Sequence, residues 1–326
     1  MSPTTTAAAT GLGVALLATP LVRALARRSG WVAKPNPIVP QHVAPTALLG
    51  GVAIAVACGT GLAALGEFGR EKLALGTAAG FLVLGLLDDR AALSARAKFA
   101  LQALAALLAV LAGAHGHFSG IAALDGAISW FWILLLVNAF NFLDVCDGLL
   151  VGVALVYFSY AAFVSPAHAP LAATMAGATA GFLAYNRPRA SIFLGDAGSH
   201  LLGSLAAVIS LTPVIAPGGF SGLALQMVAL GIPLFECLFI TSLRVHRGVP
   251  WWRGSPDHIA LRLQVLGWSR WRTVLFAWGC ALALAAGALA LARVAAPWAW
   301  VAEAVGFLGA VAFAAWLLAR GRASAV

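Results

Sequence analysis

The sequence predicts an all-α integral membrane protein made of one domain, residues 1–326, with about eleven transmembrane helices. Hydrophobic residues make up 62% of the chain and charged residues only 10%, whereas about 25% of the residues in soluble globular proteins are charged. The mean hydropathy of +0.94 agrees with this class. Apolar runs of nearly twenty residues recur between short polar breaks, as expected of a chain that crosses a bilayer many times.

Eleven apolar runs are candidates for these helices, since about 20 mostly apolar residues span the hydrocarbon core. The third and the sixth run are short. We expect the first run to remain as a span and not to be a cleaved signal peptide, because its positive residues follow it instead of preceding it. The runs cover approximately residues 7–26, 44–65, 73–88, 97–114, 121–141, 148–164, 168–185, 199–216, 221–243, 273–292 and 296–318.

The basic residues predict the orientation of the spans. Seventeen of the 20 Lys and Arg residues fall in one set of alternate loops and only three in the other. Because cytoplasmic loops carry the excess of Lys and Arg, the first set is expected to be cytoplasmic, with the N-terminus outside and the C-terminus inside. A wrong span would disturb this alternation, so the charge pattern also supports the count of eleven.

The acidic residues point to a site on the cytoplasmic face. Six of the seven Asp residues lie in or beside the loops that carry the basic excess, and only Asp125 lies on the other side. Carboxylates close to apolar spans are costly and are candidates for functional sites. The alternative is that each Asp pairs with a nearby Arg and orients a loop. The four Cys residues form no C-x-x-C pair, so neither a disulfide framework nor a metal knuckle is indicated.

The first acidic cluster is GLLDDRAALSARAKF, residues 85–99. The adjacent carboxylates of Asp88 and Asp89 repel each other unless a cation lies close or one of them takes a proton. They are therefore candidates for a metal-linked base. Lys98 follows within ten residues and could pair with them or with a substrate phosphate. The alternative for this cluster is a helix cap followed by a solvated turn.

The second cluster is NAFNFLDVCDGLL, residues 138–150. On an ideal helix, residues three apart diverge by about 60° at each step, so four such residues face one site only if the helix ends among them. Gly148 favours this break. Oxygen atoms of Asn and Asp are hard ligands of the kind that Mg²⁺ prefers. The polar residues at this spacing are Asn138, Asn141, Asp144 and Asp147.

The third cluster is IFLGDAGSHLLG, residues 192–203. Asp196 lies between Gly195 and Gly198, where the backbone and a ligand can approach closely. Ser199 is predicted to be the N-cap of the eighth span. A helix N-terminus beside an Asp is suited to a metal-bound phosphate.

The fourth segment is the longest predicted cytoplasmic loop, residues 244–272, with six Arg, two His and four Trp residues. The Trp and Arg residues alone are typical of an interfacial belt in contact with anionic lipids. The spacing of Asp257, His258 and Arg262 brings two of them onto one helical face, which favours a contact with phosphate or sugar.

In this order, the four segments resemble the polyprenyl-phosphate N-acetylhexosamine-1-phosphate transferase family. This family includes bacterial undecaprenyl-phosphate GlcNAc-1-phosphate transferases and, more distantly, phospho-N-acetylmuramoyl-pentapeptide transferases. The resemblance covers most of the chain, and His42, Pro45 and Gly50-Gly51 loosely match the family's first cytoplasmic loop. The main matches are Asp88-Asp89 with Lys98 for D-D…K, residues 138–148 for N-A-x-N-x-x-D-G-x-D-G, and residues 193–199 for F-x-G-D-x-G-S.

The resemblance implies an enzyme of the bacterial inner (plasma) membrane that starts cell-envelope glycan synthesis. The implied reaction moves a sugar-1-phosphate, first GlcNAc-1-phosphate, from a UDP-sugar to polyprenyl (undecaprenyl) phosphate and releases UMP. The implied cofactor is Mg²⁺, with Mn²⁺ as the alternative. The implied partners are these substrates, membrane lipids and a second copy of the chain in a homodimer, but no nucleic acid.

The resemblance also implies roles for ten residues of this chain. Asp88 and Asp89 would position or deprotonate the lipid phosphate, and Asn141 and Asp196 would hold the metal ion. The residues expected to bind substrate are Lys98, Asn138, Asp144, Asp147, His258 and Arg262.

The chain departs from the family pattern at three places. Val145 stands where the family often has Gly, and Glu236 stands where Asp is usual. Residues 258–263 read HIALRL where the family commonly reads H-x-H-H-R-L, so one of three histidines is kept. These departures keep open an inactive or re-purposed member of the same fold.

Two other classes are alternatives. A secondary transporter predicts acidic groups near mid-membrane and repeats in hydropathy, whereas the acidic residues here cluster at predicted helix ends. A CDP-alcohol phosphotransferase needs D-G-x-x-A-R, and this chain lacks the Ala-Arg after Asp147-Gly148.

Overall fold

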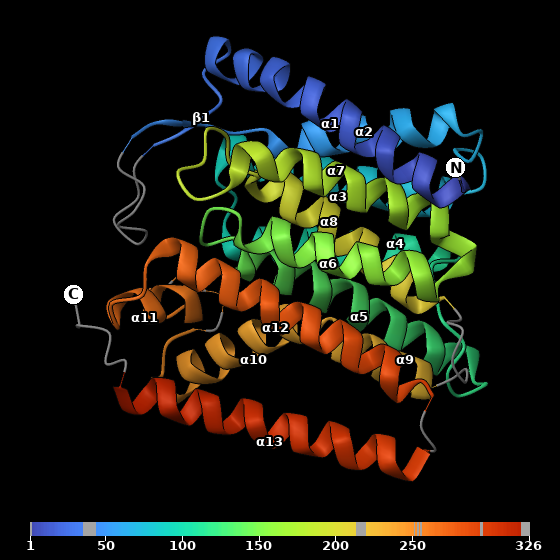
Figure 1. Cartoon of the computed structure of the whole chain (residues 1–326), viewed down its shortest axis with the longest axis vertical. Coiled ribbons are helices and arrows are strands. Elements are labelled where there is room, and N and C mark those ends of the chain that lie inside the picture. Colours follow the sequence, from blue (N-terminus) through green and yellow to red (C-terminus); the bar gives the residue numbers. More distant parts are fainter. Residues whose placement is uncertain are drawn as a thin grey trace.

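A computed structural model describes residues 2–34, 44–212, 220–250, 252, 254, 256–293 and 296–320. The chain is a bundle of long helices with one two-stranded hairpin, which confirms the predicted all-α class (Figure 1). The helices are α1 Pro3–Arg28, α2 Gly50–Ala64, α3 Lys72–Ala91, α4 Ala95–Leu111, α5 Ala122–Leu143, α6 Leu149–Val164, α7 Ala169–Asn186, α8 Gly195–Leu211, α9 Phe220–Ala229, α10 Gly231–His246, α11 Ile259–Val265, α12 Arg270–Leu291 and α13 Ala296–Arg320, with a 3₁₀ turn η1 at Pro166–His168.

A helix covers most of the described residues of each of the eleven predicted runs, and the ninth run is divided between α9 and α10. Among the described residues, three helices are long and apolar enough to cross a membrane by themselves: α1, α5 and α12. The number rises to five if two bent pairs each count as one span. These pairs are α6 with η1 and α7, bent by 114°, and α9 with α10, bent by 81°. The count of eleven spans and the orientation stay predictions.

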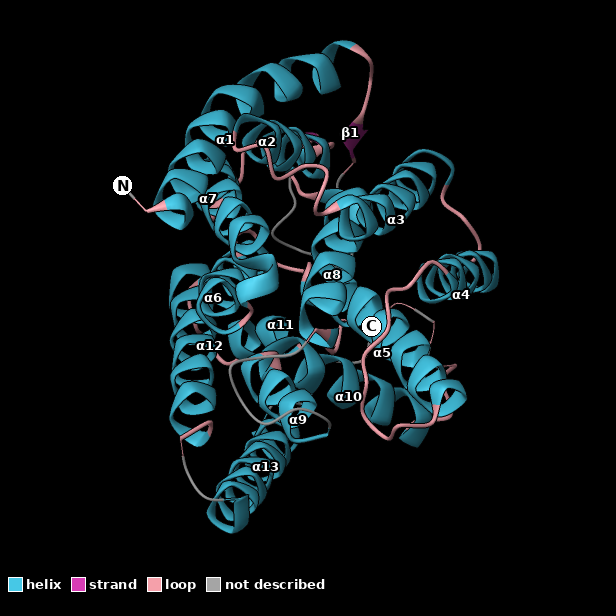
Figure 2. Ribbon diagram, turned by 90° about the vertical axis from the view of Figure 1, so that its right-hand side faces the viewer, coloured by secondary structure: helices cyan, strands magenta, loops and turns pink. Residues whose placement is uncertain are grey.

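The long helices lie roughly side by side in a stack, with α1 at one edge and α13 at the other (Figure 1). Helix α8 lies inside the stack, and every residue from Ala197 to Leu211 is buried (Figure 2). Its backbone touches that of α3, because a Cβ atom on Gly85 would lie 2.4 Å from the Cα atom of Ala197. Only glycine allows this approach, and it brings the last turn of α3 beside the first turn of α8.

The hairpin covers the loop that leads into α8. Strands β1 (Val32–Ala33) and β2 (Thr46–Ala47) are antiparallel. The backbone N–H of Phe193 donates to the carbonyl of Ala47 at 2.8 Å, so the hairpin and the start of α8 form one unit. His42, which loosely matched a family motif, lies outside the described residues.

Two sequence predictions about local structure need correction. The prediction that Ser199 caps the eighth span is wrong, because α8 begins at Gly195 and Ser199 lies inside it. Residues 244–272 are not one loop. They begin in α10, contain α11 and end in α12.

Candidate active site

A cavity of about 1150 Å³ lies where α3 and α5 end and α8 and α12 begin. The β1–β2 hairpin and the loop between α7 and α8 complete its wall. Half of the ten predicted site residues line it, although they come from three separate stretches of the chain. These residues are Asp89, Asn141, Asp144, Asp147 and Asp196.

The two adjacent carboxylates at the end of α3 have different partners. Asp88 Oδ2 lies 2.7 Å from Lys98 Nζ, and its Oδ1 accepts a hydrogen bond from the backbone N–H of Leu93 at 2.8 Å. Asp89 accepts from the backbone N–H groups of Asp196 and Ala197, at 2.9 and 3.1 Å. Lys98 therefore offsets one charge of the pair, and the positive N-terminal end of α8 offsets the other.

Lys98 also reaches the third acidic cluster. Its Nζ lies 2.9 Å from Asp196 Oδ2 and 3.4 Å from Asn141 Oδ1. Asn141 Nδ2 donates to Asp196 Oδ1, and to Ser199 Oγ at 3.0 Å. The Asp196 side chain is the most exposed of the three ion-paired groups in this cluster at 30%, against 17% for Lys98 and 9% for Asp88. The cluster thus presents Asp196 to the cavity.

Asp144 is different because its carboxylate makes no hydrogen bond or ion pair within the part of the chain that the structure describes. It follows the last residue of α5 and lines the cavity. Burial raises its pKa well above the ordinary value of 3.8, and the negative charges of Asp196 and Asp89 raise it further. A partly buried carboxylate without a partner favours a cation close to it.

Asp147 holds the loop between α7 and α8. Its Oδ2 accepts from the backbone N–H groups of Arg189 and Ala190, at 3.1 and 3.2 Å, and lies 3.8 Å from Arg270 Nη1. The helix break predicted at Gly148 is confirmed, because α5 ends at Leu143 and α6 begins after Gly148, whose φ is +74°.

Four predicted substrate-binding residues do not line the cavity: Lys98, Asn138, His258 and Arg262, of which Lys98 contacts the cavity residue Asp196. Asn138 turns into the protein, where its Nδ2 donates to Gln102 Oε1 at 3.0 Å and to the carbonyl of Leu134 at 2.8 Å. His258 and Arg262 lie in a separate cluster around α10 and α11. Their role in substrate binding stays a prediction.

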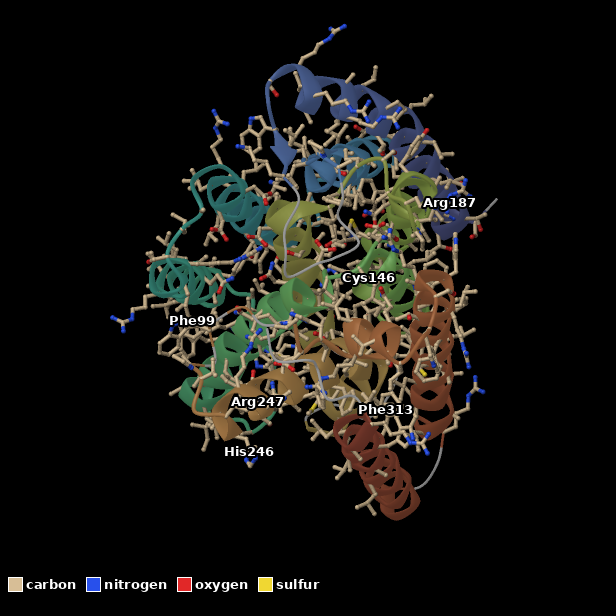
Figure 3. All side chains as sticks on the ribbon, turned by 90° about the vertical axis from the view of Figure 1, so that its left-hand side faces the viewer. Phe99, Cys146, Arg187, His246, Arg247 and Phe313 are labelled. Atoms are coloured by element: carbon tan, nitrogen blue, oxygen red, sulfur yellow. The ribbon has the colours of Figure 1, made fainter. Side chains whose placement is uncertain are left out.

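Two buried carboxylates hold this separate cluster together. Glu236 Oε1 lies 2.9 Å from His258 Nδ1, and the carboxylate oxygens of Asp257 lie 2.6 Å from Arg262 Nη2 and 2.8 Å from Arg247 Nη1. Glu236, which stands where Asp is usual in the family, is a buried partner of His258 in the segment 244–272. Figure 3 shows Arg247 of this cluster well apart from Cys146 of the cavity wall.

The cavity also contains residues that no motif singled out. Three basic side chains line it, as does Trp271 beside Arg270 at the start of α12. In the sequence, these basic residues served only to predict orientation, and the Trp was typical of an interfacial belt. Nothing in their local pattern marks them as cavity residues. The basic residues are Lys34, Arg189 and Arg270.

The donor atoms around the cavity fit a Mg²⁺ ion. Among the described residues, no three His, Cys, Asp or Glu side chains lie close enough to hold a metal without other ligands. Mg²⁺ commonly binds one or two carboxylates and completes its coordination with water and substrate phosphates. Asp196, which faces the cavity, and Asp144, which has no partner among the described residues, could supply this pair of carboxylates, and Asn141 could supply an amide oxygen.

Comparison with known proteins identifies the family. Residues 72–214, which include all five predicted site residues that line the cavity, match the model of glycosyl transferase family 4. A Bacillus subtilis protein named as a probable undecaprenyl-phosphate N-acetylglucosaminyl 1-phosphate transferase is 30% identical over 277 residues, which cover 80% of this chain and 77% of that protein.

Two further relatives have related activities in their names. Decaprenyl-phosphate N-acetylglucosaminephosphotransferase of Mycobacterium tuberculosis is 32% identical over 315 residues, covering 81% of this chain and 77% of the relative. Phospho-N-acetylmuramoyl-pentapeptide-transferase of Deinococcus radiodurans is 30% identical over 284 residues, covering 74% and 88%. These matches confirm the resemblance seen in the four segments. The chain belongs to glycosyl transferase family 4 and is a membrane-bound transferase.

Proposed function

We propose that the protein transfers N-acetylhexosamine-1-phosphate, with GlcNAc-1-phosphate as the first candidate, from a UDP-sugar to undecaprenyl or another polyprenyl phosphate. An oxygen of the lipid phosphate attacks the phosphorus attached to the sugar. The bond to the second phosphorus breaks, and UMP leaves. The observation that carries this proposal is that Lys98 and Asn141 hold the carboxylate of Asp196 at the wall of a polar cavity. The names of the three relatives support the same reaction.

The cavity has charges of both signs, as a nucleotide diphosphate with a metal ion requires. Asp144 and Asp196, with Asn141, would hold Mg²⁺. When bound, the ion neutralises charge on the diphosphate and on the leaving UMP. Arg189 and Arg270 line the same cavity and would bind the phosphates of the donor.

The hydrogen bonds favour a positioning role for the pair at the end of α3. Each carboxylate oxygen of Asp88 and Asp89 already has a partner, either Lys98 or a backbone N–H group. Asp88 therefore holds Lys98, which would bind the phosphate of the lipid. Asp89 holds the first turn of α8 and with it Asp196.

The proposal places the cavity on the cytoplasmic side of a bacterial inner membrane, with eleven spans, the N-terminus outside and the C-terminus inside. The supporting observation is that 17 of the 20 basic residues fall in the set of loops that borders the cavity. UDP-sugars are soluble and polyprenyl phosphate lies in the bilayer, so a site at helix ends is accessible to both. The product would start a cell-envelope glycan, and a homodimer is compatible with the proposal.

Release of UMP by the purified protein tests the proposal. We expect UMP from polyprenyl phosphate, Mg²⁺ and UDP-GlcNAc, and a panel of UDP-sugars will identify the preferred donor. Asp196→Asn is expected to abolish release, and EDTA is expected to stop it until Mg²⁺ or Mn²⁺ is restored. The control is Asp125→Asn at the opposite end of α5, where the carboxylate accepts from the hydroxyl and the backbone N–H of Ser119 at 2.7 and 2.8 Å.

Two outcomes would contradict parts of the proposal. No UMP with any UDP-sugar would overturn the reaction and favour an inactive member of the fold. Undiminished turnover of Asp196→Asn, or of the wild type in EDTA, would overturn the metal assignment and leave the reaction in place.

A further inference from the structure

A buried hydrogen-bond network joins α4, α5 and α8 below the cavity. Asn138 Nδ2 lies 3.0 Å from Gln102 Oε1, and Gln102 Nε2 lies 2.7 Å from His200 Nε2. His200 Nδ1 contacts the carbonyl oxygen of Asp196. The side chains of Gln102 and His200 have no exposed surface, so water cannot replace the hydrogen bonds that each loses if the network is broken.

Each member of this network lies one helical turn from a member of the cluster that faces the cavity. Gln102 follows Lys98 by four residues on α4, and Asn138 precedes Asn141 by three on α5. On α8, His200 follows Asp196 by four residues. Residues three or four apart share a face of a helix, so the network lies one turn below the cluster of Lys98, Asn141 and Asp196. Its hydrogen-bond lengths set the spacing of α4, α5 and α8 at that level.

Helix α4 depends on this network more than its neighbours do. Only three of its 17 residues are buried, namely Gln102, Ala106 and Ala109. Figure 2 shows α4 at the edge of the bundle, beside α3 and α5. Gln102 is therefore the fully buried polar side chain that ties α4 to α8, one turn below Lys98, which reaches α8 at the edge of the cavity.

The direction of every hydrogen bond in the network is fixed by its two ends. The carbonyl of Leu134 accepts from Asn138, so the amide of Asn138 must donate there, and it donates again to Gln102 Oε1. Gln102 therefore directs its NH₂ group at His200. The nitrogen of His200 that faces it must accept, which leaves the proton on Nδ1, where it is donated to the carbonyl of Asp196.

We propose that Gln102 and His200 are positioning residues that hold Lys98 and Asp196 at their distance of 2.9 Å through a neutral, Nδ1-protonated His200. This inference rests on the proposed transfer reaction, because its main measurement is turnover. The two residues touch neither substrate. They act through the helices that carry the phosphate-binding lysine and the metal-binding aspartate.

The first test measures kcat and KM for UMP release in Gln102→Met, His200→Phe and the double variant. Both substitutions keep the side-chain volume close to the original and remove the hydrogen bonds. We expect kcat to fall by about 10- to 100-fold, because small errors in the placement of reacting groups cost rate, while KM for both substrates changes by less than about threefold. The double variant is expected to be no worse than the poorer single variant, since both break the same network.

The matched control is Trp132→Phe. Trp132 Nε1 donates to Ser210 Oγ at 2.8 Å, so this substitution also removes a buried hydrogen bond between α5 and α8. Ser210 lies 14 residues beyond Asp196 on α8, or about 20 Å along the helix. We expect Trp132→Phe to lower the unfolding temperature and to keep the kcat of the wild type. Equal losses of kcat in all three single variants would mean a merely structural role and overturn the inference.

The second test does not depend on turnover. The ¹⁵N NMR spectrum of histidine-labelled protein contains a signal of His200, assigned by its absence in His200→Phe. We expect a protonated Nδ1 and an unprotonated Nε2 without any substrate present. A protonated Nε2 would overturn the inference. So would a wild-type kcat in Gln102→Met, whereas a wild type that is inactive with every UDP-sugar and shows the expected spectrum would overturn only the proposed reaction.

Discussion

The carboxylate of Asp89 accepts a hydrogen bond from the backbone N–H of Asp196 at 2.9 Å, so the last turn of α3 holds the first turn of α8. The neighbouring Asp88 makes no such contact and pairs with Lys98 instead. Two carboxylates that are adjacent in sequence therefore act on two different elements. This division explains how they lie side by side near apolar helices without sharing one cation.

Asp89→Asn should weaken both the fold and the reaction. The amide keeps one acceptor and directs an NH₂ group at a backbone N–H, so we expect a loss of about 1 kcal/mol in the free energy of unfolding, as for other helix caps. UMP release should fall because Asp196 moves with its helix. Ser2→Ala removes a cap of the same kind from α1 and should cost stability without slowing turnover. Normal turnover in Asp89→Asn would contradict the positioning role.

Lys98→Met should have the largest effect on turnover among the basic residues. It removes the only cation shown between Asp88 and Asp196 in the described residues, and loss of one such group commonly costs about 100- to 1000-fold in kcat. Lys98→Arg should also be slow, because a planar guanidinium cannot take the place of a compact ammonium between the side-chain oxygens of Asp88, Asn141 and Asp196. UMP release measures both variants, with Lys72→Met on the exposed start of α3 as the control. Rescue by Arg would contradict this geometry.

Asp144 should make the metal-free protein less stable as the pH rises. Because burial raises the pKa of Asp144 in the fold, its protonated form is favoured there, and the resulting stability is present below the ordinary carboxyl pKa of about 4 and lost as the pH rises through the raised value. We expect the unfolding temperature in EDTA to decrease over this range. Asp144→Asn should reduce the slope, and Glu67→Gln should keep it. An unchanged slope in Asp144→Asn would exclude this residue as its source.

Arg270→Gln should weaken binding of the nucleotide-sugar. Arg270 lines the cavity and lies 3.8 Å from Asp147, so removing its charge should raise KM for the UDP-sugar by about 10-fold, equivalent to about 1.4 kcal/mol, with a smaller effect on kcat. The control is Arg272→Gln, two residues further along α12, where the guanidinium lies over the ring of Trp268. Steady-state kinetics with varied UDP-sugar separates the two. The same rise in both would indicate a general effect of charge.

His258→Gln should affect stability more than sugar choice. His258 pairs with the buried Glu236 at 2.9 Å and lies outside the cavity lining. Leaving a buried partner unsatisfied commonly costs about 1–3 kcal/mol, which should appear as a lower unfolding temperature. The ratio of kcat/KM between two UDP-sugars should stay the same. A changed ratio would restore the sugar contact that the sequence motif predicts.

The sequence predicted the helices and the three acidic clusters because both depend on local patterns. Apolar runs mark the helices, and Gly148 marks the break that turns Asp144 into the cavity. The partners of these residues could not be predicted in the same way. The contact between Lys98 and Asp196 joins positions 98 residues apart, and no local spacing encodes it.

The wrong cap at Ser199 and the unexpected partners of Asn138 and His258 have physical causes of the same kind. Ser199 carried a cap signal, but α8 receives its cap from Asp89 on another helix. Asn138 shares the three-residue spacing of its neighbours, yet it lies a turn deeper than Asn141 and meets Gln102 instead of the cavity. His258 follows the family motif, and in the structure its imidazole pairs with Glu236 on α10, while its contact with the substrate stays a prediction. In each case the hydrogen-bond partner comes from a part of the chain that is distant in sequence.

The fixed direction of the Asn138–Gln102–His200 network has a consequence for proton movement. Side-chain amides do not take up and release protons as water or carboxylates do, and both ends of the network terminate at backbone carbonyls. The network therefore does not conduct protons between the charged cluster and the deeper part of the bundle. We therefore expect a proton released during turnover to leave through the cavity and not along this network.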